Sequence, residues 1–370
     1  SASLAPGPVN TGVDQLDARF EVGGDQWTFR AGLQDRSNLG TGPGVAQALD
    51  PEGEFSSRRI NADFSYRFPE LADSLDVEAR ASYFNITQDP ENDIVLYPPG
   101  AFDGAFPEGL IGSPGYKEHQ ARFDLSAIYR GFTNHRIQTG IGGLWADLYK
   151  VTERKNFNPD FSPKGSVVDV SGDPTEVWMP EENRLSYYVF VQDEWQFAQN
   201  WQLVSGIRFD DYSDFGSAIN PRAALIWATT DTVTTKLLYG RAFRAPSLNE
   251  LYVANNPVTM GNTDLGAETI DTFEIAVSHQ LSAQLFYGIN LFYYEIEDLI
   301  TAIAVTGPVS QEYRNSEDRT GHGGEVELTY SPVDEVKLTA NYAYQKSTDE
   351  RNNSSVGEAP NHQLYGRMEW

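Results

Sequence analysis

The sequence contains no cysteine among its 370 residues. Disulfides, zinc–thiolate sites and cysteine nucleophiles are therefore excluded. No apolar run approaches the roughly 18 residues of a transmembrane helix, but the alternating strands of a membrane β-barrel would leave no such run. Residues 1–10 lack the basic start and apolar core of a signal peptide. We expect an exported protein with this sequence to have lost its beginning.

Basic residues are also scarce, with 27 Lys and Arg against 53 Asp and Glu and a net charge of −26. Nucleic acid is an improbable partner, because phosphate binding needs clustered cations. Acid spread over solvated loops is the favoured interpretation, and loop sites for Ca²⁺ are the alternative. Asp210, Asp211 and Asp214 crowd one loop and are the candidate Ca²⁺ ligands, since this ion takes several hard oxygens. A polar turn is the favoured interpretation of these residues, and the Ca²⁺ site is the alternative.

No catalytic constellation is recognisable. The five histidines are scattered, and none has the spacing of a metal-binding motif such as H-E-x-x-H. The sequence therefore predicts neither an enzyme nor a bound cofactor, apart from the possible structural Ca²⁺.

What the chain does have is alternation of apolar and polar residues. Residues 60, 62, 64, 66 and 68 are apolar or small, for example, while Arg59, Asp63 and Arg67 lie on the other side. About fifteen such runs follow one another, most of them longer than an average strand of roughly six residues. The connections between them alternate short and long, which is the rule of up-and-down membrane barrels.

Full charges recur on the polar side of strand after strand. A β-sandwich core could not bury that second face, although one solvated face per sheet would fit either model. In a large barrel the charged face lines a wet or plugged lumen. The 19 Tyr, 20 Phe and 7 Trp suit the aromatic girdles of a barrel, although a sandwich core would also use them. The predicted fold class is all-β: a transmembrane antiparallel up-and-down β-barrel.

Two stretches in the C-terminal half are more specific. YGRAFRAPSLNEL, ending at Leu251, is followed by GNTDLGAETIDTFEIAV, ending at Val277. Together they resemble the C-terminal barrel half of TonB-dependent outer-membrane receptors, where G-x-x-F-R-A-P-x-x-x-E-L precedes N-x-x-L-x-x-E-T-x-x-x-x-E. The usual proline of the second stretch is replaced by Ala267. Receptors of this family have about 22 strands around a plugged lumen.

The resemblance implies an internal piece of a longer receptor, with residues 1–370 as a partial barrel domain lacking the plug and the terminal strands. A terminal Trp370 acting as an outer-membrane assembly signal is the rival interpretation. The tight turn after the first strand predicts that this strand runs towards the periplasm. Residues 89–115, 155–182 and 244–266 should then be extracellular, and residues 69–74 and 331–334 periplasmic.

Candidate ligand contacts come from the motif and from the long loops. Arg241 and Arg244 would meet an anionic ligand or a plug carboxylate, or they would shape the passage from strand to loop. Loop aromatics and amides suit compact ligand sites but could equally pack the loops together. These candidates are Tyr97, Phe102, Phe106, Phe157, Trp178, Tyr252, Asn255 and Tyr313.

The resemblance predicts an outer-membrane receptor of the Gram-negative envelope. It would bind a scarce nutrient, a ferric siderophore or cobalamin-like compound, and import it with energy from the TonB complex. Its expected partners are that ligand, TonB through the missing N-terminal region, and membrane lipid. The alternative is a passive porin, an adhesin or a soluble carbohydrate-binding β-protein.

Overall fold

The computed structural model describes residues 3–256, 258–306, 311–357 and 359–370. Fifteen long strands, here called the wall strands, form one curved antiparallel sheet. They are β1 (Asp14–Gly23), β2 (Trp27–Gly40), β3 (Glu54–Ala72), β4 (Leu75–Pro90), β6 (Leu110–Tyr129), β7 (His135–Phe157), β9 (Glu182–Ala198), β10 (Trp201–Tyr212), β11 (Gly216–Ala228), β12 (Val233–Arg244), β14 (Glu268–Ser282), β15 (Leu285–Ala304), β16 (Gln311–Val333), β17 (Val336–Asp349) and β19 (His362–Glu369).

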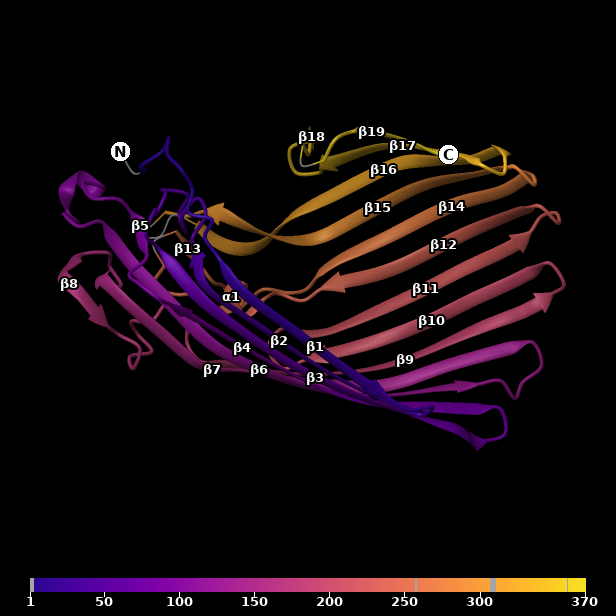
Figure 1. Ribbon diagram of the computed structural model, residues 1–370, viewed down its shortest axis with the longest axis horizontal. Helices are drawn as coiled ribbons and strands as arrows, with labels where there is room; N and C mark the ends of the chain where they lie inside the picture. The colour runs from indigo at the N-terminus through magenta and orange to yellow at the C-terminus, as the bar shows by residue number, and fades with distance from the viewer. Residues whose placement is uncertain (1–2, 257, 307–310, 358) are drawn as a thin grey trace.

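Each wall strand pairs with the next one along the chain, which is the predicted up-and-down order. The remaining elements are short: β5 (Val95–Tyr97), β8 (Pro163–Asp169), β13 (Thr259–Met260), β18 (Ser354–Ser355), a single 3₁₀ turn η1 (Phe102–Gly104) and the helix α1 (Leu248–Tyr252). No described helix has the length and apolar character to cross a membrane. Among the described residues no pairing joins β1 to β19, and the sheet stands open between them (Figure 1).

The two ends of the sheet differ. Tight turns join the strands at the right of Figure 1, whereas β5, β8, α1 and β13 gather at the left. The predicted alternation of short and long connections is therefore confirmed. The strands run further into the long connections than the sequence indicated: β6 already begins at Leu110, and β7 ends only at Phe157. The expected loop at 300–311 likewise shrinks, because β15 reaches Ala304; residues 307–310 lie outside the described chain.

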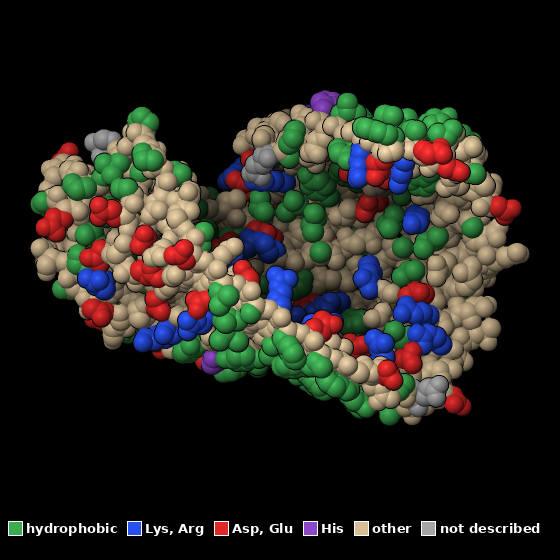
Figure 2. Space-filling view, in the orientation of Figure 1, with side chains coloured by type: hydrophobic (Ala, Val, Ile, Leu, Met, Phe, Trp, Pro, Cys, Tyr) green, Lys and Arg blue, Asp and Glu red, His purple; other side chains and the backbone are tan. Residues whose placement is uncertain are grey.

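The two faces of the sheet have the predicted characters. Large apolar side chains such as Phe64, Phe123 and Ile141 stand exposed on the outer face. On the inner face Arg30 pairs with Glu21 at 2.8 Å, and Arg80 pairs with Asp63 of the neighbouring strand. Figure 2 shows Lys, Arg, Asp and Glu side chains in the hollow of the sheet, and apolar side chains along its outside. An apolar outer face is thus separated from a charged inner face, which is the arrangement expected of a membrane barrel.

Aromatic side chains of the inner face lie over glycines of the adjacent strand. Tyr188 pairs with Gly142 across β9 and β7, and a Cβ built at Gly142 would lie 2.5 Å from the tyrosine ring. The ring can therefore reach across the strand, where its hydroxyl donates to Asp124 at 2.6 Å. Gly321 makes the same room for Tyr294 between β16 and β15. These close approaches fix the register of strands that have no core between layers.

We expect the face assignment on β17 to be measurable in the intact protein. Ala340 lies on the outer face and Asn341 on the inner face, next to each other in the strand. Ala340→Arg should destabilise the folded protein by about 2–4 kcal/mol if it lies near mid-membrane, and Asn341→Arg should have little effect. Unfolding in urea with reconstitution in lipid gives both values. Equal losses for the two variants would refute the assignment.

Candidate functional site

The long connections form a packed cap, here called the loop crown: residues 91–109, 158–181 and 245–267. Three clusters of buried apolar residues lie in it or at the strand ends beneath it. The first surrounds Ile94 and Phe106, the second Val177 and Met179, and the third Leu251 and Leu265. Tyr252 of α1 packs against both the second and the third cluster, so the segments support one another.

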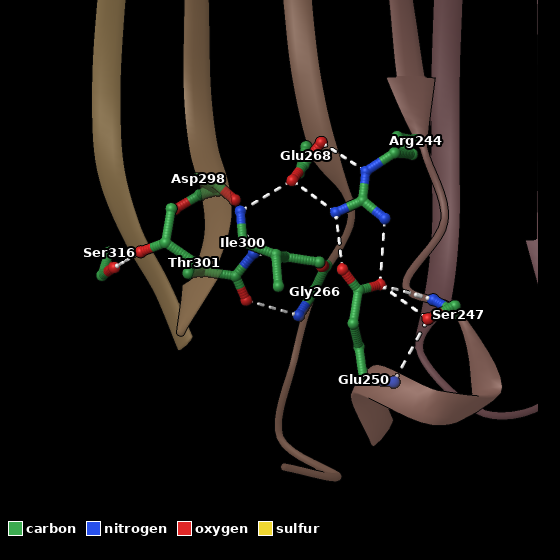
Figure 3. A network of polar contacts seen from close by, with 10 residues as sticks. Arg244, Ser247, Glu250, Gly266, Glu268, Asp298, Ile300, Thr301 and Ser316 are labelled. Atoms are coloured by element: carbon green, nitrogen blue, oxygen red, sulfur yellow. Dashed lines mark hydrogen bonds and ion pairs between the residues drawn. The ribbon is translucent and has the colours of Figure 1, made fainter. Parts of the chain in front are cut away.

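Arg244, the last residue of β12, anchors the third segment of the crown (Figure 3). Its Nε and Nη2 donate to the two carboxylate oxygens of Glu268 at 2.6 and 2.5 Å. Its Nη1 and Nη2 donate to Glu250 at 2.9 and 3.1 Å. One guanidinium thus joins the end of β12, the start of β14 and helix α1 by charge-assisted hydrogen bonds.

The two carboxylates have further partners. Glu250 and Ser247 form a capping box that starts α1, in which each side chain accepts a hydrogen bond from the backbone N–H of the other. Glu268 also accepts the backbone N–H of Ile300 at 2.7 Å, which adds β15 to the network. Polar residues of both sequence motifs therefore hold the crown segment 245–267 to the sheet.

Two asparagine side chains hydrogen-bond to backbone groups in and beside the second motif. Asn315 of β16 exchanges hydrogen bonds with the backbone of Gly266, accepting from its N–H at 2.8 Å and donating to its carbonyl at 3.1 Å. Asn262 donates to the carbonyl of Tyr313 at 3.1 Å. Sequence reasoning missed Asn315, because a lone asparagine inside a polar strand carries no signal.

The two candidate arginines are both engaged by the protein itself. Arg241 shares the outer face with Leu237, and its guanidinium nitrogens lie 3.7 Å from Asp271 and 3.5 Å from Glu297. It therefore points away from the hollow of the sheet. Arg244 gives its donors to Glu250 and Glu268. This geometry favours the interpretation that these residues shape the passage from strand to loop.

Some of the candidate loop residues pack or join the crown segments, and others line a cavity. Phe106 and Phe157 are 4% and 1% exposed in the first apolar cluster, so they pack the loops and do not face a ligand. The amide of Asn255 donates to the carbonyls of Thr175 and Val177, both at 2.9 Å, and so joins two crown segments. Trp178 packs beside Tyr116, and its indole nitrogen is buried without a hydrogen-bond partner among the described residues.

Tyr97 and Tyr313 are brought together by the fold. Both line a cavity of about 350 Å³ in the crown, and Phe102, which is exposed, lies against the Tyr97 ring at 5.1 Å between centroids. The wall of the cavity also contains residues that the sequence did not single out, among them Gln47, Asn249, Val253 and Asn256. Aromatic rings beside amides are suited to a ligand with both apolar and hydrogen-bonding groups.

The proposed Ca²⁺ ligands are not brought together. Strand alternation turns Asp210 to the inner face, where it pairs with Arg208 at 2.6 Å, and turns Asp211 to the outer face. Asp214, beyond the end of β10, pairs with Arg184 at 2.7 Å. No group of three acidic or histidine side chains in the described part of the chain is placed to hold a metal ion. In the described chain the three carboxylates therefore do not converge on one point, and the turn is polar.

A buried charged cluster lies where β7 rises above the wall. Beyond Leu148 this strand no longer pairs with β9 but with the crown strand β8, so Glu153 and Lys155 are outside the membrane-spanning part. Lys155 is fully buried and contacts Glu176 of the crown. Glu153 is 3% exposed, and one of its carboxylate oxygens is buried with no hydrogen-bond partner in the part of the chain that the structure describes. Burial raises the pKa of Glu153 to about 7, although Lys155 opposes the shift.

A family model described as TonB dependent receptor-like, beta-barrel matches residues 5–370. An iron-regulated outer membrane virulence protein of Vibrio cholerae is 26% identical over 200 residues, which cover 49% of this chain and 31% of that protein. The vitamin B12 transporter BtuB of Vibrio cholerae is 30% identical over 120 residues, covering 32% of this chain and 18% of BtuB.

Solved structures share the fold at low sequence identity. The copper transporter OprC superposes with a TM-score of 0.71 at 14% identity, over 96% of this chain and 56% of OprC. A variant of the ferric enterobactin receptor of Pseudomonas aeruginosa, in complex with enterobactin, gives 0.69 at 17% identity, over 99% of this chain and 57% of the receptor. The chain thus spans little more than half the length of these structures.

We expect Arg244→Ala to loosen the crown segment 245–267. The change leaves Glu250 and Glu268, whose side chains are 15% and 10% exposed, without their cation. The local cost should be about 1–3 kcal/mol, because an uncompensated carboxylate is left partly buried. Hydrogen–deuterium exchange of this segment in the intact protein measures it. Arg314→Ala is the matched control, since it removes only an exposed pair with Glu312 two residues away. Equal protection of the segment in both variants would contradict the anchoring role.

The crown segment 158–181 should open as the pH rises. The folded protein holds the Glu153 proton more tightly than the unfolded chain does, because its pKa lies near 7 instead of 4.5. This contribution to stability is complete below about pH 4.5 and is lost as the pH rises through about 7. Lys155, Glu176, Lys164 and Asp173 are the other charged groups of the cluster.

Exchange of residues 158–181, corrected for the intrinsic rate, should therefore be faster at about pH 8 than at about pH 5.5. Glu153→Gln should abolish this dependence, while Asp160→Asn, at an exposed position of the same segment, should preserve it. A pH dependence that survives in Glu153→Gln would assign the effect to another group.

Proposed function

The chain belongs to the TonB-dependent receptor β-barrel family and lies in the outer membrane of a Gram-negative cell, and we propose that it supplies wall and ligand-binding loops of a nutrient-uptake receptor. The observation that carries this proposal is the loop crown. A transmembrane wall with a charged interior ends on one side in a packed cap that contains an aromatic and amide-lined cavity. Such a cap offers a preformed site for a compound arriving from outside.

The ligand class proposed is a ferric siderophore or a cobalamin-like compound. Two kinds of observation support it: the relatives include an iron-regulated outer membrane protein and a vitamin B12 transporter, and the Tyr97–Tyr313 cavity combines rings with amides. Both ligand types are too large and too scarce for passive diffusion. We therefore propose import driven by the TonB complex through parts of the receptor outside this chain. No catalytic step is part of the proposal.

Uptake by cells that carry the full-length receptor as their sole receptor of this class tests the function. Radiolabelled ferric enterobactin and cyanocobalamin are supplied separately, first at low temperature to measure surface binding, then at growth temperature with and without a protonophore. We expect one ligand to bind tightly and to enter only in energised cells. Equal entry of both compounds with and without the protonophore would point to a passive pore and refute the proposal.

The double variant Tyr97→Ala, Tyr313→Ala tests the proposed cavity. Surface binding should weaken by about 30-fold, which corresponds to the roughly 2 kcal/mol of an aromatic anchor in an interface. Phe132→Ala is the control, because this exposed phenylalanine lies at a tight turn on the opposite end of the sheet. Unchanged binding in the double variant, with cell-surface levels equal to wild type, would remove the cavity from the proposal.

A further inference from the structure

Residues 173–179 of the crown, here called the strap, lie against the buried charged cluster of β7. Lys155 donates to the backbone carbonyl of Glu176 and lies 3.5 Å from its carboxylate. The carboxylate of Glu153 accepts the backbone N–H of Trp178. The strap also contributes buried side chains to the second apolar cluster. It is thus held to β7 at the place where the Glu153 carboxyl lies.

The strap is also joined to the wall of the crown cavity. Nδ2 of Asn255 donates to the backbone carbonyls of Thr175 and Val177, both at 2.9 Å. The backbone N–H of Ala254 donates to the carbonyl of Trp178 at 2.7 Å. The residues on either side of the pair 254–255 line the cavity of about 350 Å³. Hydrogen bonds therefore connect the strap directly to a segment of the cavity wall.

The closed strap leaves several polar atoms without a partner. One carboxylate oxygen of Glu153, one of Glu176 and the indole nitrogen of Trp178 are buried, and none has a hydrogen-bond partner among the described residues. Each has lost its water without gaining a protein partner, which favours the open strap. Segments with such contacts open more easily than the wall strands, so a change of charge at Glu153 is able to shift the balance between closed and open.

Charged and titratable groups surround Glu153 on several elements. They are Lys155 of β7, Asp173 and Glu176 of the strap, Lys164 of β8, Tyr116 of β6 and Tyr252 of α1. Burial raises the pKa of Glu153 to about 7, Lys155 and the N–H of Trp178 oppose the shift, and Glu176 adds to it. An ionised Glu153 is therefore poorly solvated beneath the closed strap, whereas water solvates it when the strap is open.

We propose that Glu153 is a positioning residue for the crown cavity and acts through the strap. With its carboxyl protonated, the strap stays closed and holds the cavity wall at residues 253–256. When the carboxyl ionises, the strap opens and this wall loosens, so the ligand binds more tightly at mildly acidic than at mildly alkaline pH. The inference rests on the proposed function, since the cavity is the proposed ligand site.

Binding of ferric enterobactin and of cyanocobalamin to the purified full-length receptor is measured from about pH 5.5 to about pH 8. Over this range the ratio of open to closed strap should rise on the order of tenfold. Wild type should therefore bind its ligand at least about threefold more weakly at the higher pH. Glu153→Gln cannot ionise and should retain only the titration of the ligand itself. The same pH dependence in Glu153→Gln and in wild type would overturn the proposal.

Asn255→Gly tests the route from the strap to the cavity. Glycine accepts the positive φ of 47° at this position and removes both side-chain donors. Exchange of the strap should keep its dependence on pH, whereas ligand binding and exchange of residues 253–256 should become clearly less dependent on it. Ligand binding that follows pH as steeply in Asn255→Gly as in wild type would show that the strap does not act on the cavity.

Asn353→Gly is the matched control. Asn353 also has a positive φ, of 54°, but it lies exposed in a turn and does not line the cavity. The same substitution there should leave strap exchange, wall exchange and ligand binding at their wild-type dependence on pH. An effect equal to that of Asn255→Gly would assign the result to a general loosening of the loops and overturn the proposed route.

The exchange measurements need no ligand, so the two proposals can fail separately. The proposed function fails if wild type binds neither ferric enterobactin nor cyanocobalamin at any pH in the range. The positioning role fails if exchange of residues 253–256 in wild type does not follow pH, or follows it equally in Glu153→Gln, whether or not a ligand binds.

Discussion

The structure depends first on the pairing of backbone N–H and C=O groups between neighbouring strands. In hydrocarbon an unpaired group costs several kcal/mol, so each wall strand must lie along another over its whole membrane span. That requirement leaves side chains free to alternate, one set towards lipid and the next towards the interior. Where the pairing ends, as between β11 and β12 beyond Arg222 and Gly240, the wall gains a recess in place of a ladder.

A single-layered wall has no hydrophobic core, so specific packing must come from elsewhere. Inside the hollow it comes from glycines that admit a neighbouring ring, as Gly142 admits Tyr188. In the crown it comes from three apolar clusters and from the Arg244 guanidinium shared by Glu250 and Glu268. The crown is thus an organised cap instead of a set of independent loops, which is what a preformed binding surface requires.

The alternation of side chains between the two faces also determines where the charged residues lie. The inner face contains paired ions such as Arg80 with Asp63, whereas the outer face near the middle of the wall is apolar. Above the wall Glu153 and Lys155 are buried beneath the crown, where dielectric screening is weak. The proposed ligand site and the expected pH sensitivity therefore both belong to the crown, and the apolar outer face suits insertion into a membrane.

The sequence alone determined the fold class, the number of wall strands and the side to which Ala340 or Asn341 points, because these follow from a period of two residues and from turn spacing. It also identified the motifs that contain Arg244 and Glu268, but not that these two side chains pair across 24 residues of chain. Only the tertiary structure decided that Phe106 is buried, that Tyr97 meets Tyr313, and that Asp210 and Asp211 face opposite sides. Alternation is local and is written in the sequence, whereas contacts between distant loops depend on which strands bring those loops together.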